Sequence, residues 1–91
     1  MLDFKNYPEI PELTRGALLR YVNDGLRPGG FLTCVLSNDL MGAISRADVF
    51  NQKALLKICQ FIYNEMPSNS HGSREKVENW MDKVLLAKLA E

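Results

Sequence analysis

The sequence predicts an all-α protein, a compact bundle of four to five helices around a central hydrophobic helix at about residues 48–66. Apolar residues recur at helical spacing in several segments, and no segment alternates as a strand does. In residues 48–66, Lys53, Lys57, Gln60 and Asn64 form a polar stripe at helical period, and almost every residue between them is apolar. A helix with so narrow a polar stripe is expected to be covered by neighbours on most of its circumference.

The first quarter of the chain is read as a lead-in followed by a helix. Residues 1–8 are expected to be extended, with Leu2, Phe4 and Tyr7 lying across the domain or across a partner subunit. A helix is predicted over residues 11–24, because proline suits the first helical position and glycine at position 25 suits a helix end. Its buried side is expected to carry Leu13, Ala17, Leu18, Tyr21 and Val22.

Residues 25–30 (GLRPGG) are the strongest turn signal, and Pro28 with Gly29 fits the central positions of a type II turn. A short helix is predicted over 30–36. The segment 37–39 (SND) consists of residues that favour helix N-caps, so a break followed by a third helix to residue 47 is preferred over one helix across 30–47. On this third helix, the inward residues are expected to be Leu40, Ile44 and Ala47. The opposite face, with Asp39, Gly42, Ala43 and Arg46, leaves room for another backbone or a ligand.

The second half is predicted to hold two longer helices. Asp48 caps the central helix and Pro67 ends it, and residues 67–72 form a loop. Ser73 caps the last helix, whose buried stripe is Val77, Trp80, Met81, Val84 and Leu85. Leu86 and Leu89 lie off this stripe, so they are candidates for an oligomer interface, and a homo-oligomer is expected. The alternative is that they are scattered surface leucines.

Composition limits the function classes. The 91 residues are expected to form one domain, 1–91, with eleven basic and eleven acidic residues and no net charge. This balance argues against nucleic-acid binding, so a small helical DNA-binding protein is the weakest alternative. No apolar run is long enough to span a membrane, and a cytoplasmic protein without membrane contact is expected. Cys34 and Cys59 are expected to be buried, reduced thiols, with a disulfide as the alternative.

The residues that could carry catalysis do not form a recognisable set. His71 is the only histidine, and it lies in a loop beside Ser70 and Ser73. A catalytic nucleophile needs its base within hydrogen-bond reach and a third group to orient that base, which neighbours in such a loop rarely provide. No spacing of metal ligands is present either. We therefore predict a non-enzymatic protein with no cofactor and no metal.

The best polar constellation combines arginines of the first helix and its exit turn with polar residues near the break. Gly29 and Gly30 open a helix beside Arg27, and guanidinium groups there would suit a phosphate or a carboxylate. The candidate ligand-binding residues are Arg15, Arg20, Arg27, Asn38, Asp39 and Arg46. The alternative is surface ion pairing, of Asp24 with Arg20 and of Asp39 with Arg46.

One stretch carries a family resemblance. Residues 28–40 (PGGFLTCVLSNDL) with Arg46-Ala47-Asp48 resemble a family of small proteins encoded by phages and prophages, which carry P-G-x-F-L-x-x-V-L-x-N-D-L and R-A-D in this order. The resemblance covers about residues 8–80, since it continues through Tyr63-Asn64-Glu65, Pro67, Gly72-Ser73, Glu75-Lys76-Val77 and Trp80. His71 departs from the family pattern, which has tryptophan before Gly-Ser.

The resemblance transfers no catalytic residue and implies a phage accessory protein, many of which act on host machinery or host defence. The expected mode of action is binding. In the first hypothesis, the protein sequesters an anionic small molecule, such as a nucleotide signal, in a pocket between subunits. In the alternative, it is an inhibitor or adaptor that binds a host protein through an exposed surface, where Leu86 or Leu89 would matter.

Overall fold

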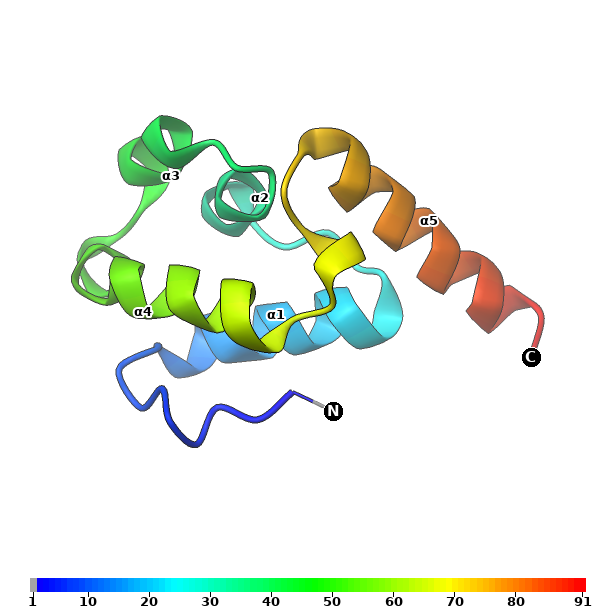
Figure 1. Cartoon of the computed structure of the whole chain (residues 1–91), viewed down its shortest axis with the longest axis horizontal. Coiled ribbons are helices and arrows are strands. Elements are labelled where there is room, and N and C mark those ends of the chain that lie inside the picture. Colours follow the sequence, from blue (N-terminus) through cyan, green and yellow to red (C-terminus); the bar gives the residue numbers. More distant parts are fainter. Residues whose placement is uncertain (1) are drawn as a thin grey trace.

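The computed structural model describes residues 2–91, and in this part of the chain it contains five α-helices and no strand (Figure 1). The prediction of an all-α bundle is confirmed. The α-helices are α1 (Glu12–Asp24), α2 (Gly30–Leu36), α3 (Leu40–Arg46), α4 (Val49–Glu65) and α5 (Arg74–Leu89). A short 3₁₀ helix, η1 (Ser68–Ser70), lies in the loop between α4 and α5.

Most helix ends lie where the local sequence predicts them. The side chains of Asp39, Asp48 and Ser73 each accept a hydrogen bond from the backbone N–H three residues later, which caps α3, α4 and α5. Gly25 ends α1 with a left-handed φ of 68°. Pro11 was expected to be the first helical residue, but it is the N-cap, and the helix begins one residue later.

The predicted break between the second and third helices is confirmed. α2 ends at Leu36, and Asn38 has a φ of 65°, a conformation that asparagine tolerates better than most residues. The predicted type II turn at Pro28–Gly29 is wrong. Gly29 has a φ of −61° and a ψ of 173°, so it lies in the extended region as the N-cap of α2 rather than at a positive φ.

One hydrophobic core joins all five helices. The largest of its fully buried side chains include Leu18 and Tyr21 of α1, Leu36 of α2, and Ile58 and Phe61 of α4. Val77 and Met81 bring α5 into the same cluster. Cys34 is buried and Cys59 is half-buried, and both are free thiols.

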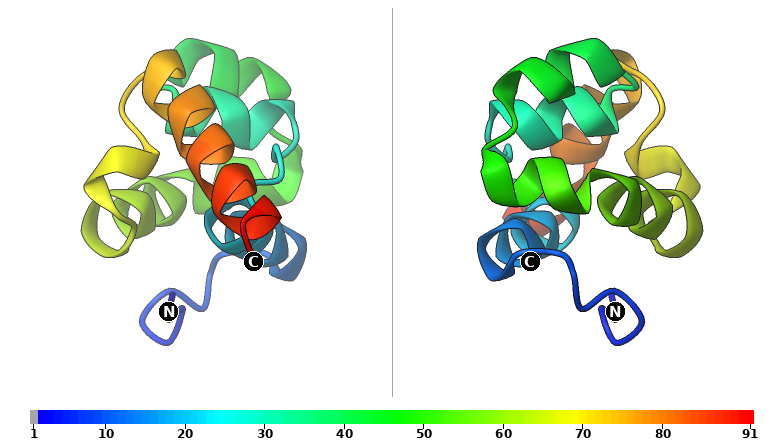
Figure 2. Two further views of the ribbon diagram at one scale, coloured as in Figure 1. Left: turned by 90° about the vertical axis from the view of Figure 1, so that its right-hand side faces the viewer. Right: turned by 90° about the vertical axis from the view of Figure 1, so that its left-hand side faces the viewer.

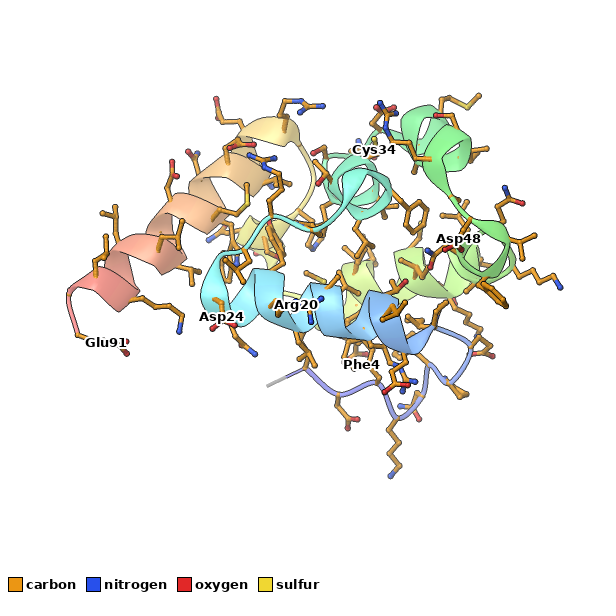
Figure 3. All side chains as sticks on the ribbon, turned by 180° about the vertical axis from the view of Figure 1, so that it is seen from behind. Phe4, Arg20, Asp24, Cys34, Asp48 and Glu91 are labelled. Atoms are coloured by element: carbon orange, nitrogen blue, oxygen red, sulfur yellow. The ribbon has the colours of Figure 1, made fainter. Side chains whose placement is uncertain are left out.

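The N-terminal segment packs on its own domain, which was one of the two predicted arrangements. The ring of Phe4 stacks on that of Phe61 with centroids 4.2 Å apart, and Tyr7 meets the same ring edge-on at 5.1 Å. The Tyr7 hydroxyl donates a hydrogen bond of 3.1 Å to Glu65. These contacts hold the segment beneath the helices, where Figure 3 labels Phe4.

The predicted orientation of α3 is wrong for its two large apolar residues, whereas Ala47 is partly buried against the core as expected. Ala43 is fully buried, whereas Leu40 and Ile44, expected inside, are exposed together with Met41. α3 packs mainly against α2, and a small side chain at the contact allows two short helices to approach closely. The space predicted above Gly42 is filled by the Asp39 carboxylate, which lies where a Cβ of residue 42 would be.

Two further predictions of burial are wrong. Leu13 of α1 is exposed, and its neighbour Thr14 is buried instead, with its hydroxyl donating a hydrogen bond of 2.7 Å to Asn51 of α4. On α4 the exposed face is wider than the polar stripe, because Leu56 and Tyr63 are exposed as well. α4 therefore contributes one side to the core and leaves the other uncovered.

α5 packs against α1, α2 and η1 and covers the core from their side. Figure 2 shows it crossing in front of α1 and α2, and its first turns follow the loop that contains η1. At its far end, Lys88 forms an ion pair of 3.1 Å with Asp24 of α1. Of the helices in residues 2–91, none is both long enough and apolar enough to cross a membrane.

Candidate functional site

The six predicted ligand-binding residues do not share one site, and Arg27 shows the reason. Its Nη2 donates to both carboxylate oxygens of Glu78 on α5, at 2.8 and 2.6 Å. This pair, in which one nitrogen serves both oxygens, joins the exit turn of α1 to α5 and offsets the positive charge of Arg27. Both side chains are about half exposed, so the pair lies at the surface.

Arg20 and Arg46 each lie over a glycine. A Cβ built on Gly16 would be 3.1 Å from Nη1 of Arg20, so the arginine folds back along its own helix. A Cβ built on Gly30 would be 3.2 Å from Cδ of Arg46, which places that side chain across the start of α2. The expected ion pairs of Asp24 with Arg20 and of Asp39 with Arg46 are not formed, since Asp24 pairs with Lys88.

Asn38 and Asp39 have local structural roles at the break between α2 and α3. The Asp39 carboxylate accepts the N–H of Gly42 at 3.0 Å, and the positive φ of Asn38 turns the chain. Asn38 also lines a cleft of about 160 Å³ with Cys59, Tyr63 and His71. Within that cleft, burial and the nearby Lys76 charge lower the pKa of His71, while a backbone hydrogen bond at Met66 acts in the opposite direction.

Arg15 is the one predicted arginine that borders a large cleft. This cleft, of about 440 Å³, lies between the N-terminal segment, α1 and α4, and Lys53 and Phe50 also line it. Nε of Arg15 is buried and has no hydrogen-bond partner among residues 2–91. Two carboxylates, Glu9 and Glu12, line the same cleft and offset the two cations. An anion would meet no net positive charge here.

A different cleft has the composition expected of an anion site. It encloses about 240 Å³ and lies along α5 beside η1. Its lining consists of Trp80, two lysines and two asparagines: Asn69, Lys76, Asn79, Trp80 and Lys83. The lining contains no carboxylate that would offset the two lysines. We call this feature the Trp80 cleft.

The geometry around the indole ring favours a flat, negatively charged ligand. Nζ of Lys83 lies 5.5 Å from the centroid of the Trp80 ring, within range of a cation–π interaction. The indole Nε1 is buried without a hydrogen-bond partner in residues 2–91, so the ring borders the cleft through its carbon atoms. The indole ring, the Lys83 ammonium over it and the side-chain amides bring apolar surface, charge and hydrogen-bonding groups together in one place.

The sequence analysis did not predict this cleft, although the spacing of four of its lining residues places them on one helix face. Lys76, Asn79, Trp80 and Lys83 follow one another at i, i+3, i+4 and i+7 on α5 and therefore share one helix face. Trp80 was assigned to the buried stripe of that helix, and the structure leaves it half-buried at the edge of the core. The fifth lining residue, Asn69, comes from η1 and carries no spacing signal.

The predicted interface leucines lie at the outer end of α5. Leu86 and Leu89 are both exposed, and the neighbouring Leu85 is partly exposed. Among residues 2–91, no three histidine, cysteine, aspartate or glutamate side chains gather closely enough to hold a metal ion. Comparison of the chain with protein-family models, with curated proteins and with solved structures finds no match.

Proposed function

We propose that the protein is a non-enzymatic phage or prophage accessory protein that binds an anionic small molecule with a planar ring, such as a nucleotide, in the Trp80 cleft. The observation that carries this proposal is the lining of that cleft, in which one tryptophan, two lysines and two asparagines occur without a carboxylate. Sequestration of a nucleotide signal would counter a host defence that the signal activates. The phage assignment is supported by the sequence resemblance over residues 8–80.

Each part of a nucleotide has a complementary group in the cleft. The base takes the place of the Lys83 ammonium over the Trp80 ring and stacks there, an interaction worth about 1–3 kcal/mol per base in single-stranded complexes. The ammonium groups of Lys76 and Lys83 attract the phosphate, and the amides of Asn69 and Asn79 can pair with base or sugar edges. Closed ligand pockets usually enclose about 300–1,000 Å³. A cleft of about 240 Å³ therefore suits one mononucleotide that remains partly exposed.

Trp80 provides the readout because it is the only tryptophan in the chain. We expect AMP, GMP, CMP or UMP to quench its fluorescence saturably, with a Kd of about 1 mM or tighter. The double variant Lys76→Gln with Lys83→Gln should weaken the binding at least about tenfold, because each lost charge-assisted hydrogen bond is worth about 1.5–3 kcal/mol. Inorganic phosphate alone should bind more weakly than the nucleotide.

The matched control is Lys5→Gln, which removes one exposed positive charge from the N-terminal segment, outside the cleft lining. It should leave the titration unchanged. Linear, non-saturating quenching by all four mononucleotides, or equal affinity in the double lysine variant, would contradict nucleotide binding in this cleft.

One observation favours the alternative function, an inhibitor or adaptor that binds a host protein. α3 directs Leu40, Met41 and Ile44 outward, and Met41 is 75% exposed. Exposed apolar clusters on small proteins often mark protein-binding surfaces. Under this alternative, Met41→Glu with Ile44→Lys abolishes capture of the host protein while nucleotide titrations and helical content stay the same.

A further inference from the structure

α4 carries a second apolar face that the core does not use. Val49, Leu56 and Tyr63 lie seven residues apart, and their side chains are 56%, 69% and 82% exposed. Because seven residues make almost two helical turns, the three side chains lie along one line of the helix. Between them lie Gln52, which is exposed, and Cys59, which is half-buried. We call these five residues the α4 stripe.

The opposite side of α4 faces the core, where Ala54, Ile58 and Phe61 are buried. In Figure 1, α4 lies on the near side of the molecule and no other helix crosses in front of it. Figure 3, the view from behind, shows α1 in front of α4. The α4 stripe is therefore open to a partner that approaches from outside.

The spacing indicates what kind of partner fits. Positions 49, 52, 56, 59 and 63 alternate in steps of three and four, which is the spacing of the contact positions in a two-helix coiled coil. None of these residues is charged, so covering them buries no ionised group. At 17 residues, α4 presents a contact line about 25 Å long. A helix of similar length is the complementary shape.

The charges beside the stripe favour a second copy of the same chain, aligned in parallel. Asp48 directly precedes Val49, and Lys53 follows Gln52. In a parallel coiled coil, the residue directly before the first contact position, here Asp48, lies beside the residue five positions later on the other helix, here Lys53. One carboxylate oxygen of Asp48 accepts the Asn51 N–H as the cap of α4, and the other oxygen would then meet Lys53 of the other copy, which forms two ion pairs. In an antiparallel pair centred on Leu56, Asp48 would meet Asn64 and gain no opposite charge.

We propose that the protein forms a homodimer in which the α4 helices of two copies pack in parallel along the α4 stripe, with Leu56 of each copy at the centre. The absence of net charge means that two copies do not repel each other as a whole. This contact uses neither the Trp80 cleft nor the outer end of α5. The dimer and the nucleotide site can therefore be tested separately.

The first test is sedimentation equilibrium between about 1 µM and about 1 mM, the range in which moderate and weak complexes dissociate. We expect a monomer–dimer equilibrium for the unmodified protein. Leu56→Glu should weaken association at least about tenfold, since two like charges would face each other at the centre of the contact. Asn64→Glu is the matched control, because it also adds one exposed negative charge to α4 but lies off the stripe. Circular dichroism tests whether both variants fold. If Leu56→Glu unfolds, Tyr63→Glu takes its place in the test.

The second test uses the cysteines already present. In the parallel pair, Cys59 faces its counterpart, so mild oxidation should yield a disulfide-linked dimer on a non-reducing gel. Burial raises the pKa of the Cys59 thiol, so the oxidation is run above the ordinary thiol pKa of about 8.5. Cys59→Ser should abolish the cross-link, and Cys34→Ser should retain it because Cys34 is 6% exposed.

A monomer at every concentration overturns the proposal. A dimer that survives Leu56→Glu but dissociates in Leu86→Glu with Leu89→Glu also overturns it and assigns the interface to α5. A dimer that depends on Leu56 but gives no Cys59 cross-link overturns the parallel arrangement. Because these readouts need no ligand, their failure is distinct from a failure of nucleotide binding.

Discussion

The hydroxyl of Tyr21 donates a hydrogen bond of 2.6 Å to the main-chain carbonyl of Ser70, 49 residues further along the chain. Both residues are fully buried. Burial raises the pKa of Tyr21 far above its ordinary value, with the Glu78 carboxylate acting in the same direction, so the hydroxyl keeps its proton and remains a donor. This bond ties α1 to η1, the element that leads into α5 and supplies Asn69 to the Trp80 cleft.

Tyr21→Phe should therefore destabilise the protein measurably. The variant keeps the ring but leaves the Ser70 carbonyl buried without its partner, which costs about 1–3 kcal/mol. Urea denaturation followed by circular dichroism measures the loss. Tyr63→Phe, measured at a protein concentration at which the chain is monomeric, is the matched control, because Tyr63 is largely exposed there, and it should change the unfolding free energy by less than about 0.5 kcal/mol. Equal stability of the two variants would show that the Tyr21 bond contributes nothing.

Gly25→Ala should be one of the most damaging single-methyl changes in the chain. Gly25 has a φ of 68°, and an added Cβ would lie 2.9 Å from the main-chain oxygen of Met81. The strained backbone and the contact with α5 together should lower the unfolding free energy by about 1–3 kcal/mol. Gly29→Ala is the control, because its φ is negative and no atom lies within 4 Å of the added methyl. Thermal melts of the two variants should differ clearly, with Gly29→Ala nearer the unmodified protein, because it loses only the preference of an N-cap for glycine over alanine.

The stability of the protein should fall in mild acid, in part because of His71. Burial and the charge of Lys76 lower the pKa of His71 below its ordinary value of 6.5. The unfolded chain therefore binds this proton at a higher pH than the folded chain, and protonation favours unfolding. The contribution is fully present above pH 6.5 and is lost as the pH falls through the lowered pKa. Urea titrations at several pH values should show a shallower decline for His71→Gln, whereas an identical decline would assign the acid sensitivity to carboxylates.

The Arg27–Glu78 pair should contribute little to stability although Nη2 of Arg27 contacts both carboxylate oxygens. Both side chains are about half exposed, and ion pairs of this kind are worth about 0–1 kcal/mol. A double-mutant cycle with Arg27→Ala and Glu78→Ala should give a coupling energy in that range, and about 1 M NaCl should reduce it further. Arg27→Ala should also leave mononucleotide titrations unchanged, since Arg27 does not line the Trp80 cleft. A loss of binding in this variant would place the nucleotide site at the arginines instead.

The sequence predicted the helices well because their ends depend on local chemistry. Asp39, Asp48 and Ser73 cap helices with their own side chains, and Gly25 supplies a left-handed residue, so neighbours in sequence decide these positions. The orientation of a short helix depends instead on what packs against it. α3 has seven residues, and its position on α2 buries Ala43 rather than the larger Leu40 and Ile44.

The candidate site was harder to predict than the fold. The positions of the arginines in the sequence do not show which of them lack an acidic partner in the folded protein. Arg27 is occupied by Glu78, a residue 51 positions away, and the charges near Arg15 are balanced by Glu9 and Glu12. These partners follow from tertiary packing and leave no mark on the local sequence. The spacing of Lys76, Asn79, Trp80 and Lys83 in the sequence is enough to place them on one face of α5. The contribution of Asn69 and the presence of the Trp80 cleft depend instead on how η1 packs against α5.

The two sides of α4 should tolerate different substitutions. Substitutions at Ala54, Ile58 and Phe61 change the volume of a packed core, so only side chains of similar size are compatible with folding. Val49, Leu56 and Tyr63 have no such restriction within one copy of the chain, and random drift should replace them with polar residues. In a set of related sequences, apolar residues that persist at these three exposed positions would therefore report a partner that has been retained during evolution.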